Sequence, residues 1–225
     1  MQNLGCQKFF RSFARKIGAM KIFAVGMNYA EHNKELRETL YQREEPVIFT
    51  KADSALVTNG KPFFIPDFTQ RCDYETELVV RICRLGRSIS PRFAHRYYDA
   101  VTVGIDFTAR DIQERLRRQG LPWDLCKGFD GSAVIGKWQP VASVGNNIQD
   151  LHFHLDINGT TVQQGHTADM LYTVDELISF ISQFFTLKTG DLLYTGTPAG
   201  IGPVHRDDHL SGWLEGERVL DFNVK

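Results

Sequence analysis

Three acidic residues have types and spacing that suit the binding of a divalent cation. Glu75 and Glu77 lie two apart at the start of an apolar, β-branched segment that is typical of a strand. Residues two apart on a strand share a face, so both carboxylates point the same way. Burying two neighbouring negative charges is costly without a cation. Asp106 would complete an oxygen-only site, which suits Mg²⁺ first and Mn²⁺ or Ca²⁺ next. A solvated outer face of an antiparallel strand is the alternative interpretation of the glutamate pair.

Two further positions carry groups for proton transfer or charge stabilisation. His32 and Glu35 are three apart on a predicted helix, where a carboxylate can orient an imidazole as a general base. A surface pair on a polar helix explains the same spacing. Lys127 lies among aromatic and aliphatic neighbours, where an ammonium could stabilise an enolate or oxyanion. A lysine that snorkels to the surface is the simpler account.

Three polar residues are candidates for substrate contacts. Arg110 and Gln113 follow Asp106 at a predicted strand-to-helix junction, where donors converge on anions, although Arg110 also suits an ordinary helix surface. Thr197 lies in the glycine-rich loop 196–202 and offers a hydroxyl and an amide. The glycine spacing of this loop excludes a dinucleotide fingerprint, and the loop lacks the Gly-Lys-Ser/Thr of a phosphate loop. A simple turn is the alternative interpretation.

The composition of the 225 residues is that of an ordinary globular protein, with 42% hydrophobic residues and a formal net charge of −1. This balance favours neither nucleic acid nor a membrane surface as a partner. The four cysteines form no C-x-x-C pair, which indicates free thiols in a reducing compartment. Residues 1–20 are basic and lack acidic residues, so we expect an N-terminal extension outside the fold, with residues 21–225 as a single catalytic domain. The predicted location is cytoplasmic, or mitochondrial if residues 1–20 are a presequence.

Hydrophobic periodicity predicts a β-rich α+β fold. Helices are expected over residues 30–40, 92–98, 109–118 and 174–185, the third with a capping-box-like start at Thr108 and Asp111. The Asn158-Gly159 dipeptide predicts a hairpin turn between 151–157 and 160–163. The other expected strands are 21–25, 46–51, 63–65, 77–82, 101–105, 134–135, 192–195 and 218–224.

Six segments in this order resemble the fumarylacetoacetate hydrolase superfamily, in its compact single-domain branch. They are residues 25–32, 49–57, 73–77, 106–111, 127–130 and 195–202. The resemblance implies a fumarylacetoacetase-like roll or barrel of mixed β-sheets with a few peripheral helices. It also implies a homodimer and one divalent cation, typically Mg²⁺.

The resemblance also implies roles for the candidate residues. The metal ligands would be Glu75, Glu77 and Asp106; the catalytic residues His32, Glu35 and Lys127; the substrate contacts Arg110, Gln113 and Thr197. His32 and Glu35 match a dyad carried on a mobile lid. The sequence departs from the usual pattern of the family at Gly131-Ser132 and in the short charged segment 202–216. These departures leave the rim of the pocket, and hence the size of the substrate, open.

Residues and resemblance together predict Mg²⁺-dependent hydrolysis of a C–C bond in a 2,4-dioxo acid, which is acylpyruvate hydrolase activity. Oxaloacetate decarboxylation would use the same electron sink. One alternative is an isomerase or decarboxylase of dienoic 2-oxo diacids, such as 2-hydroxyhepta-2,4-diene-1,7-dioate. An alternative of another class is a non-catalytic protein that binds a metal or a 2-oxo acid.

Overall fold

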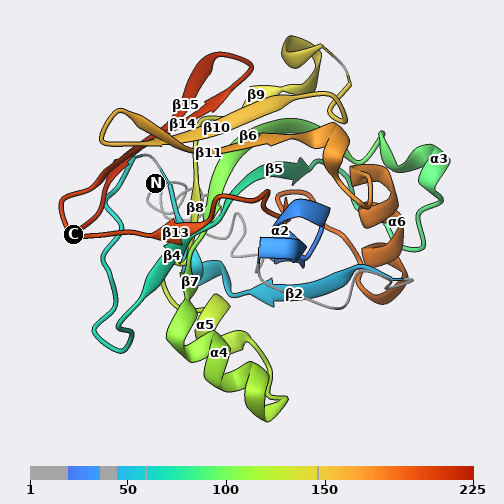
Figure 1. Cartoon of the computed structure of the whole chain (residues 1–225). Helices are drawn as coiled ribbons and strands as arrows, with labels where there is room; N and C mark the ends of the chain where they lie inside the picture. The colour runs from blue at the N-terminus through green and yellow to red at the C-terminus, as the bar shows by residue number, and fades with distance from the viewer. Residues whose placement is uncertain (1–19, 36–44, 59, 146) are drawn as a thin grey trace, which may run out of the picture.

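The structure is a computed structural model that describes residues 20–35, 45–58, 60–145 and 147–225. The extension predicted over residues 1–20 therefore lies outside the described residues, except for Met20. The β-rich α+β prediction is confirmed (Figure 1). In the described part of the chain, no helix is long and apolar enough to cross a membrane.

Strands dominate the described chain. They are β1 (Ile22–Gly26), β2 (Val47–Lys51), β3 (Leu56–Val57), β4 (Cys72–Tyr74), β5 (Thr76–Ile82), β6 (Tyr98–Asp106), β7 (Thr108–Ala109), β8 (Ala133–Ile135), β9 (Gln139–Pro140), β10 (His152–Ile157), β11 (Thr160–His166), β12 (Leu192–Tyr194), β13 (Gly202–Pro203), β14 (His209–Leu214) and β15 (Glu217–Asn223). The α-helices are α2 (Ala30–Glu35), α3 (Pro91–Ala94), α4 (Arg110–Gln119), α5 (Asp124–Lys127) and α6 (Val174–Phe184).

The strands form three sheets. The largest has the order β2-β1-β12-β5-β6-β8-β3, with β9 also paired to β6. It is mixed, because β1 pairs parallel to β12 and β3 parallel to β8 while its other pairs are antiparallel. A second sheet, β11-β10-β14-β15, is antiparallel, and a small third sheet has the order β13-β4-β7. Figure 1 shows the second sheet above β5 and β6, α3 and α6 to one side, and α4 with α5 projecting below.

One hydrophobic core joins the two larger sheets. It contains buried residues from β5 and β6 on one side and from β10, β14 and β15 on the other. The rings of Phe63 and Phe107 stack with their centroids 3.7 Å apart, and Phe222 packs edge-on against Phe107. Burial of such aromatic and aliphatic surface is the main force that holds the sheets together.

Helix α6 follows its predicted pattern closely. Leu177, Ile178 and Ile181 face the core, as their helical spacing requires. A capping box begins the helix: the Thr173 hydroxyl accepts from the backbone N–H of Glu176, whose carboxylate accepts from the N–H of Thr173.

The predicted capping box at α4 is wrong. Thr108 belongs to β7, and the residue that precedes the helix, Ala109, has no side-chain capping bond. The Asp111 carboxylate instead accepts hydrogen bonds from the hydroxyl of Thr69 and the backbone N–H of Gln70. The acidic residue of the first turn therefore ties the helix to the loop before β4.

Three further predictions need correction. The helix expected over 92–98 ends at Ala94, because Tyr98 already pairs with Ile82 as the first residue of β6. Residues 63–65 form only an isolated bridge, with backbone hydrogen bonds to residues 223–225. Strand β14 was not predicted, because its surroundings are rich in charged and turn residues. Of the helix expected over 30–40, residues 30–35 are helical and the remainder lies outside the described residues.

A substitution at Gly104 tests how tightly β6, the strand that carries Asp106, is packed. An added Cβ would lie 2.6 Å from Cγ2 of Val79 and 2.8 Å from the carbonyl oxygen of Val134, and backbone cannot easily move away. We expect Gly104→Ala to lower the free energy of unfolding by about 1–3 kcal/mol in urea denaturation. Gly26→Ala is the control, because its nearest neighbour is the edge of the Trp123 ring at 3.3 Å. Equal losses in the two variants would contradict this account.

Candidate active site

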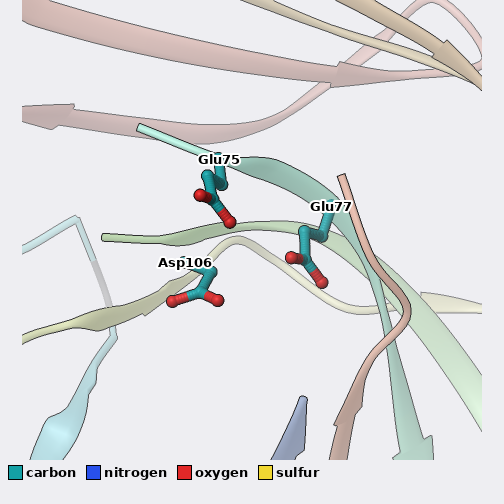
Figure 2. A group of neighbouring side chains, drawn as sticks. All are labelled: Glu75, Glu77 and Asp106. Atoms are coloured by element: carbon teal, nitrogen blue, oxygen red, sulfur yellow. The ribbon is translucent and has the colours of Figure 1, made fainter. Parts of the chain in front are cut away.

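The pairing of β5 with β6 brings the three predicted acidic residues together. Glu77 lies on β5 opposite Gly104, and Asp106 ends β6 with its backbone N–H bonded to the carbonyl of Glu75 at 2.8 Å. One carboxylate oxygen from each residue lies within 4.8 Å of the others, and all three residues are buried. Figure 2 shows the three carboxylates directed toward a common space. Among the described residues, no other group of His, Cys, Asp or Glu side chains meets this spacing.

Buried cations contact two of the three carboxylates. The Lys127 ammonium lies 2.6 Å from Oε2 of Glu75 and 2.9 Å from Oδ2 of Asp106. The Lys51 ammonium lies 2.6 Å from Oδ1 of Asp106. Arg110 donates from Nη2 to Oε1 of Glu75 at 2.6 Å. Each cation is nearly or fully buried, so the ion pairs are weakly screened by solvent.

Glu77 has no such partner in the described part of the chain, where no lysine, arginine or histidine nitrogen lies within 4.0 Å of its carboxylate. Its Oε2 accepts a hydrogen bond from the backbone N–H of Gly196 at 2.7 Å. Burial and the neighbouring charges of Asp106 and Glu75 raise the pKa of Glu77 well above its usual range. Burial alone would also raise the pKa of Glu75, but Lys127 and Arg110 hold it well below its usual range.

This donor set fits a hard divalent cation. All three groups offer oxygen, and the uncompensated charge is concentrated on Glu77, which would otherwise retain a proton. A divalent cation held by Glu75, Glu77 and Asp106 would take the place of that proton. The same cation would face competition from the Lys127 ammonium, which now bridges Glu75 and Asp106.

Two buried charged residues that had no assigned role also belong to this cluster. Lys51, at the end of β2, donates hydrogen bonds to the backbone carbonyl of Lys127 and to the hydroxyl of Ser132, besides its ion pair with Asp106. Asp73, on β4, accepts from Nε of Arg110 at 2.8 Å and so fixes the guanidinium against Glu75. A charged residue that ends an apolar strand was the available signal for Lys51. No pattern distinguished Asp73 from a surface aspartate.

A pocket of about 380 Å³, its mouth included, opens beside the carboxylates. Four of the predicted catalytic and substrate-binding residues line it together with Glu75; they are His32, Arg110, Gln113 and Lys127. Gln113 accepts from Nη1 of Arg110 at 2.5 Å, so one face of α4 presents a fixed pair of polar groups. Phe49 and Trp123 supply an apolar wall, with their ring centroids 5.8 Å apart.

His32 lies on α2 and is only 4% exposed. It lines the same pocket as Glu75, so the imidazole lies on the side of the cavity that carries this carboxylate. Asn28 fixes the entry to this helix by donating to the carbonyl of Thr195 at 2.8 Å and by bonding the backbone of Tyr172 in both directions. The side chain of Glu35 lies outside the described residues, so the dyad with His32 stays a prediction.

Thr197 is buried, and it is not among the described residues that line the pocket. Its hydroxyl donates to the carbonyl of Thr76 at 2.9 Å and accepts from Gln163 at 2.7 Å. The loop contributes directly through Gly196, whose positive φ of 100° is paired with a close approach to Asn28. In this structure the loop therefore positions Glu77, and substrate contact by Thr197 stays a prediction.

The chain is similar to proteins of one family over nearly its whole length. Residues 21–221 match the family model described as fumarylacetoacetate (FAA) hydrolase C-terminal. The mouse protein named oxaloacetate tautomerase FAHD1, mitochondrial, is 35% identical over 204 residues, covering 91% of each chain. Oxaloacetate tautomerase YcgM of Escherichia coli is 37% identical over 199 residues, covering 88% of this chain and 90% of that protein. A crystal structure of fumarylpyruvate hydrolase from Pseudomonas aeruginosa, in complex with Mn²⁺ and pyruvate, superposes with a TM-score of 0.85 at 34% identity, covering 92% and 89%.

Replacement of Glu77 tests the proposed cation site. At a metal concentration of about 100 times its Kd, Mg²⁺ or Mn²⁺ should stabilise the parent protein by about 2.7 kcal/mol. The Glu77→Gln variant should lose this stabilisation, measured as the shift in Tm with and without metal. Because the cation displaces a proton, the shift in the parent should shrink as the pH falls. Glu114→Gln, on the exposed face of α4, is the control. An undiminished metal-dependent shift in Glu77→Gln would refute the ligand set.

Proposed function

Because this chain belongs to the fumarylacetoacetate hydrolase family, we propose that it is a divalent-metal-dependent enzyme that acts on small 2-oxo acids. The observation that carries the proposal is the buried carboxylate cluster bordered by Lys127, beside a pocket that Glu75, Lys127 and His32 line. The similar fumarylpyruvate hydrolase of known structure, in complex with Mn²⁺ and pyruvate, supports the same substrate class. We propose Mg²⁺ or Mn²⁺ as the cation, because the donor set consists of oxygen alone.

Different residues of the pocket would bind the substrate and stabilise the enolate that forms from it. A bound divalent cation would supply Lewis acidity toward the carboxylate and 2-oxo oxygens of the substrate. Lys127 is buried, and although burial lowers its pKa, the charges of Asp106 and Glu75 raise it overall. That ammonium stabilises the negative oxygen of an enolate at the 2-position. Arg110, fixed by Asp73, holds Glu75 in place during these changes in charge.

Our first candidate reaction is hydrolysis of a 2,4-dioxo acid, that is, an acylpyruvate. His32 takes a proton from a water molecule, whose oxygen attacks the carbon of the 4-oxo group. The bond between C3 and C4 then breaks, and its electron pair remains on C3 as the enolate of pyruvate. Protonation at C3 gives pyruvate, and the acyl part leaves as a carboxylic acid. The buried imidazole in the pocket is the observation that favours hydrolysis.

The second candidate is keto–enol tautomerisation of oxaloacetate, which the names of the mouse and Escherichia coli relatives favour. This reaction moves a proton between C3 and the 2-oxo oxygen and requires no attack by water. Decarboxylation of oxaloacetate would instead break the bond between C3 and C4, release CO₂ and leave the enolate of pyruvate, as in the first candidate. Isomerisation of a dienoic 2-oxo diacid also needs only proton transfers on this platform.

Replacement of His32 separates the two candidates. Hydrolysis of acetylpyruvate by His32→Asn should fall by about 10²–10⁴-fold, because the general base is lost. Loss of the enol absorbance and release of equimolar pyruvate would be followed with Mg²⁺ or with EDTA. Tautomerisation of oxaloacetate by the same variant should fall much less, and His95→Asn, on the exposed surface after α3, is the control. Full hydrolysis by His32→Asn would overturn the role of His32, and absence of turnover of every 2-oxo acid would favour the binding-protein alternative.

Replacement of Lys127 tests the enolate step that both reactions share. We expect Lys127→Met to lower kcat for acetylpyruvate hydrolysis and for oxaloacetate tautomerisation by about 10²–10³-fold, the cost of losing one charge-stabilising donor. The metal-dependent rise in Tm should persist, because the three carboxylates remain and the competing ammonium is gone. Lys137→Met, an exposed lysine after β8, is the control. Unchanged kcat values with Lys127→Met would refute this role.

A further inference from the structure

A pair of histidines lies side by side on the second sheet, away from the strands that carry the carboxylate cluster. His152 begins β10 and His166 ends β11, and the two residues are direct partners in the antiparallel register. Their imidazole rings stack with centroids 4.1 Å apart and an interplanar angle of 15°. Side chains that are opposite in an antiparallel pair stand on the same face of the sheet.

Two carboxylates flank this pair. Oδ1 of Asp150 lies 2.7 Å from Nε2 of His166. Oε1 of Glu215 accepts the backbone N–H of His152 at 2.5 Å, which holds that carboxylate at the start of β10. The donors are thus two imidazoles with two carboxylates beside them, whereas the cluster on β5 and β6 offers oxygen alone.

From this geometry we propose that His152 and His166 form a second metal site, which binds a borderline divalent cation such as Zn²⁺ or Cu²⁺ with Asp150 as the third ligand. Imidazole nitrogen favours Zn²⁺ and Cu²⁺ over Mg²⁺, which prefers oxygen donors. The two sites therefore take different ions from the same solution. The donor atoms of His152, His166 and Asp150 do not all lie within 4.8 Å of one another in this structure, so binding requires the stacked rings to turn about their Cβ–Cγ bonds.

The backbone beneath the pair is already fixed, so ring rotation is the main reorganisation. Thr167 accepts from the backbone N–H of Leu151 through its hydroxyl at 2.9 Å, and its own N–H donates to the carbonyl of Leu151 at 2.9 Å. The carbonyl of His152 accepts from the N–H of Glu215 at 3.0 Å. The His166 side chain is 30% exposed, which leaves space for rotation and an approach for the ion.

The same strand provides a matched control. His154 stands two residues from His152 on β10, but its partners on the neighbouring strands are Gln164 and Trp213 rather than another histidine. Its ring stacks on Trp213 with centroids 5.6 Å apart. A single imidazole without a second nitrogen donor opposite it should bind Cu²⁺ or Zn²⁺ much more weakly.

The test titrates the full-length protein with Zn²⁺ by calorimetry and with Cu²⁺ by electron paramagnetic resonance, with Mg²⁺ in saturating excess. We expect one Zn²⁺ per chain at this site and a Cu²⁺ spectrum with nitrogen hyperfine coupling. His152→Gln and His166→Gln should each weaken Zn²⁺ binding at least about tenfold and remove the nitrogen coupling, because even loss of an outer-shell partner costs that much. Asp150→Asn should weaken it less, and His154→Gln should leave it unchanged.

Two results would overturn the second site. One is Zn²⁺ affinity that is the same in His152→Gln and His166→Gln as in the parent protein. The other is Zn²⁺ binding that is lost in Glu77→Gln, because the ion would then occupy the carboxylate cluster. These readouts are metal affinity and a spectrum, so they test the second site even if the protein does not catalyse the proposed reaction.

Discussion

Burial of charge on the paired strands β5 and β6 is the constraint on which the rest of this structure depends. Carboxylates that are removed from water must be matched by cations or hydrogen bonds, or they retain protons. Lys51 comes from β2, Arg110 from α4 and Lys127 from α5, so three separate elements must dock before the interior is electrostatically satisfied. The same ion pairs therefore stabilise the fold and position the reactive groups of the site.

The supporting contacts show how firmly these groups are held. Asp73 orients Arg110, and Gly196 donates its backbone N–H to Glu77. The hydroxyl of Ser132 accepts a hydrogen bond from the Lys51 ammonium. Preorganisation of this kind lowers the cost of rearrangement when charge develops on a substrate. One wall of the pocket is different in character, because Phe49 and Trp123 offer apolar surface there. The pocket thus combines charged groups with an apolar wall.

Local signals in the sequence were sufficient to predict the carboxylate cluster and much of the fold. The two-residue spacing of Glu75 and Glu77 and the helical spacing in α6 are properties of a single segment, and both could be read directly. The failures come from long-range pairing. Thr108 resembles a helix cap until β7 pairs with β4, and the helix that begins at Pro91 stops because Tyr98 pairs with Ile82. The place of Lys51 at the end of an apolar strand was only a weak signal, because its partners lie 55–81 residues further along the chain.

The absence of an ion pair to Glu77 among the described residues has a consequence for which substitutions this position would accept. A glutamine there would keep an oxygen for the Gly196 N–H and would remove a buried group that is costly to ionise. Selection for stability alone would therefore favour the amide, since buried unpaired charge is among the strongest destabilising features. A carboxylate at this position therefore lowers stability relative to the amide, which is the trade expected where a side chain serves binding rather than folding.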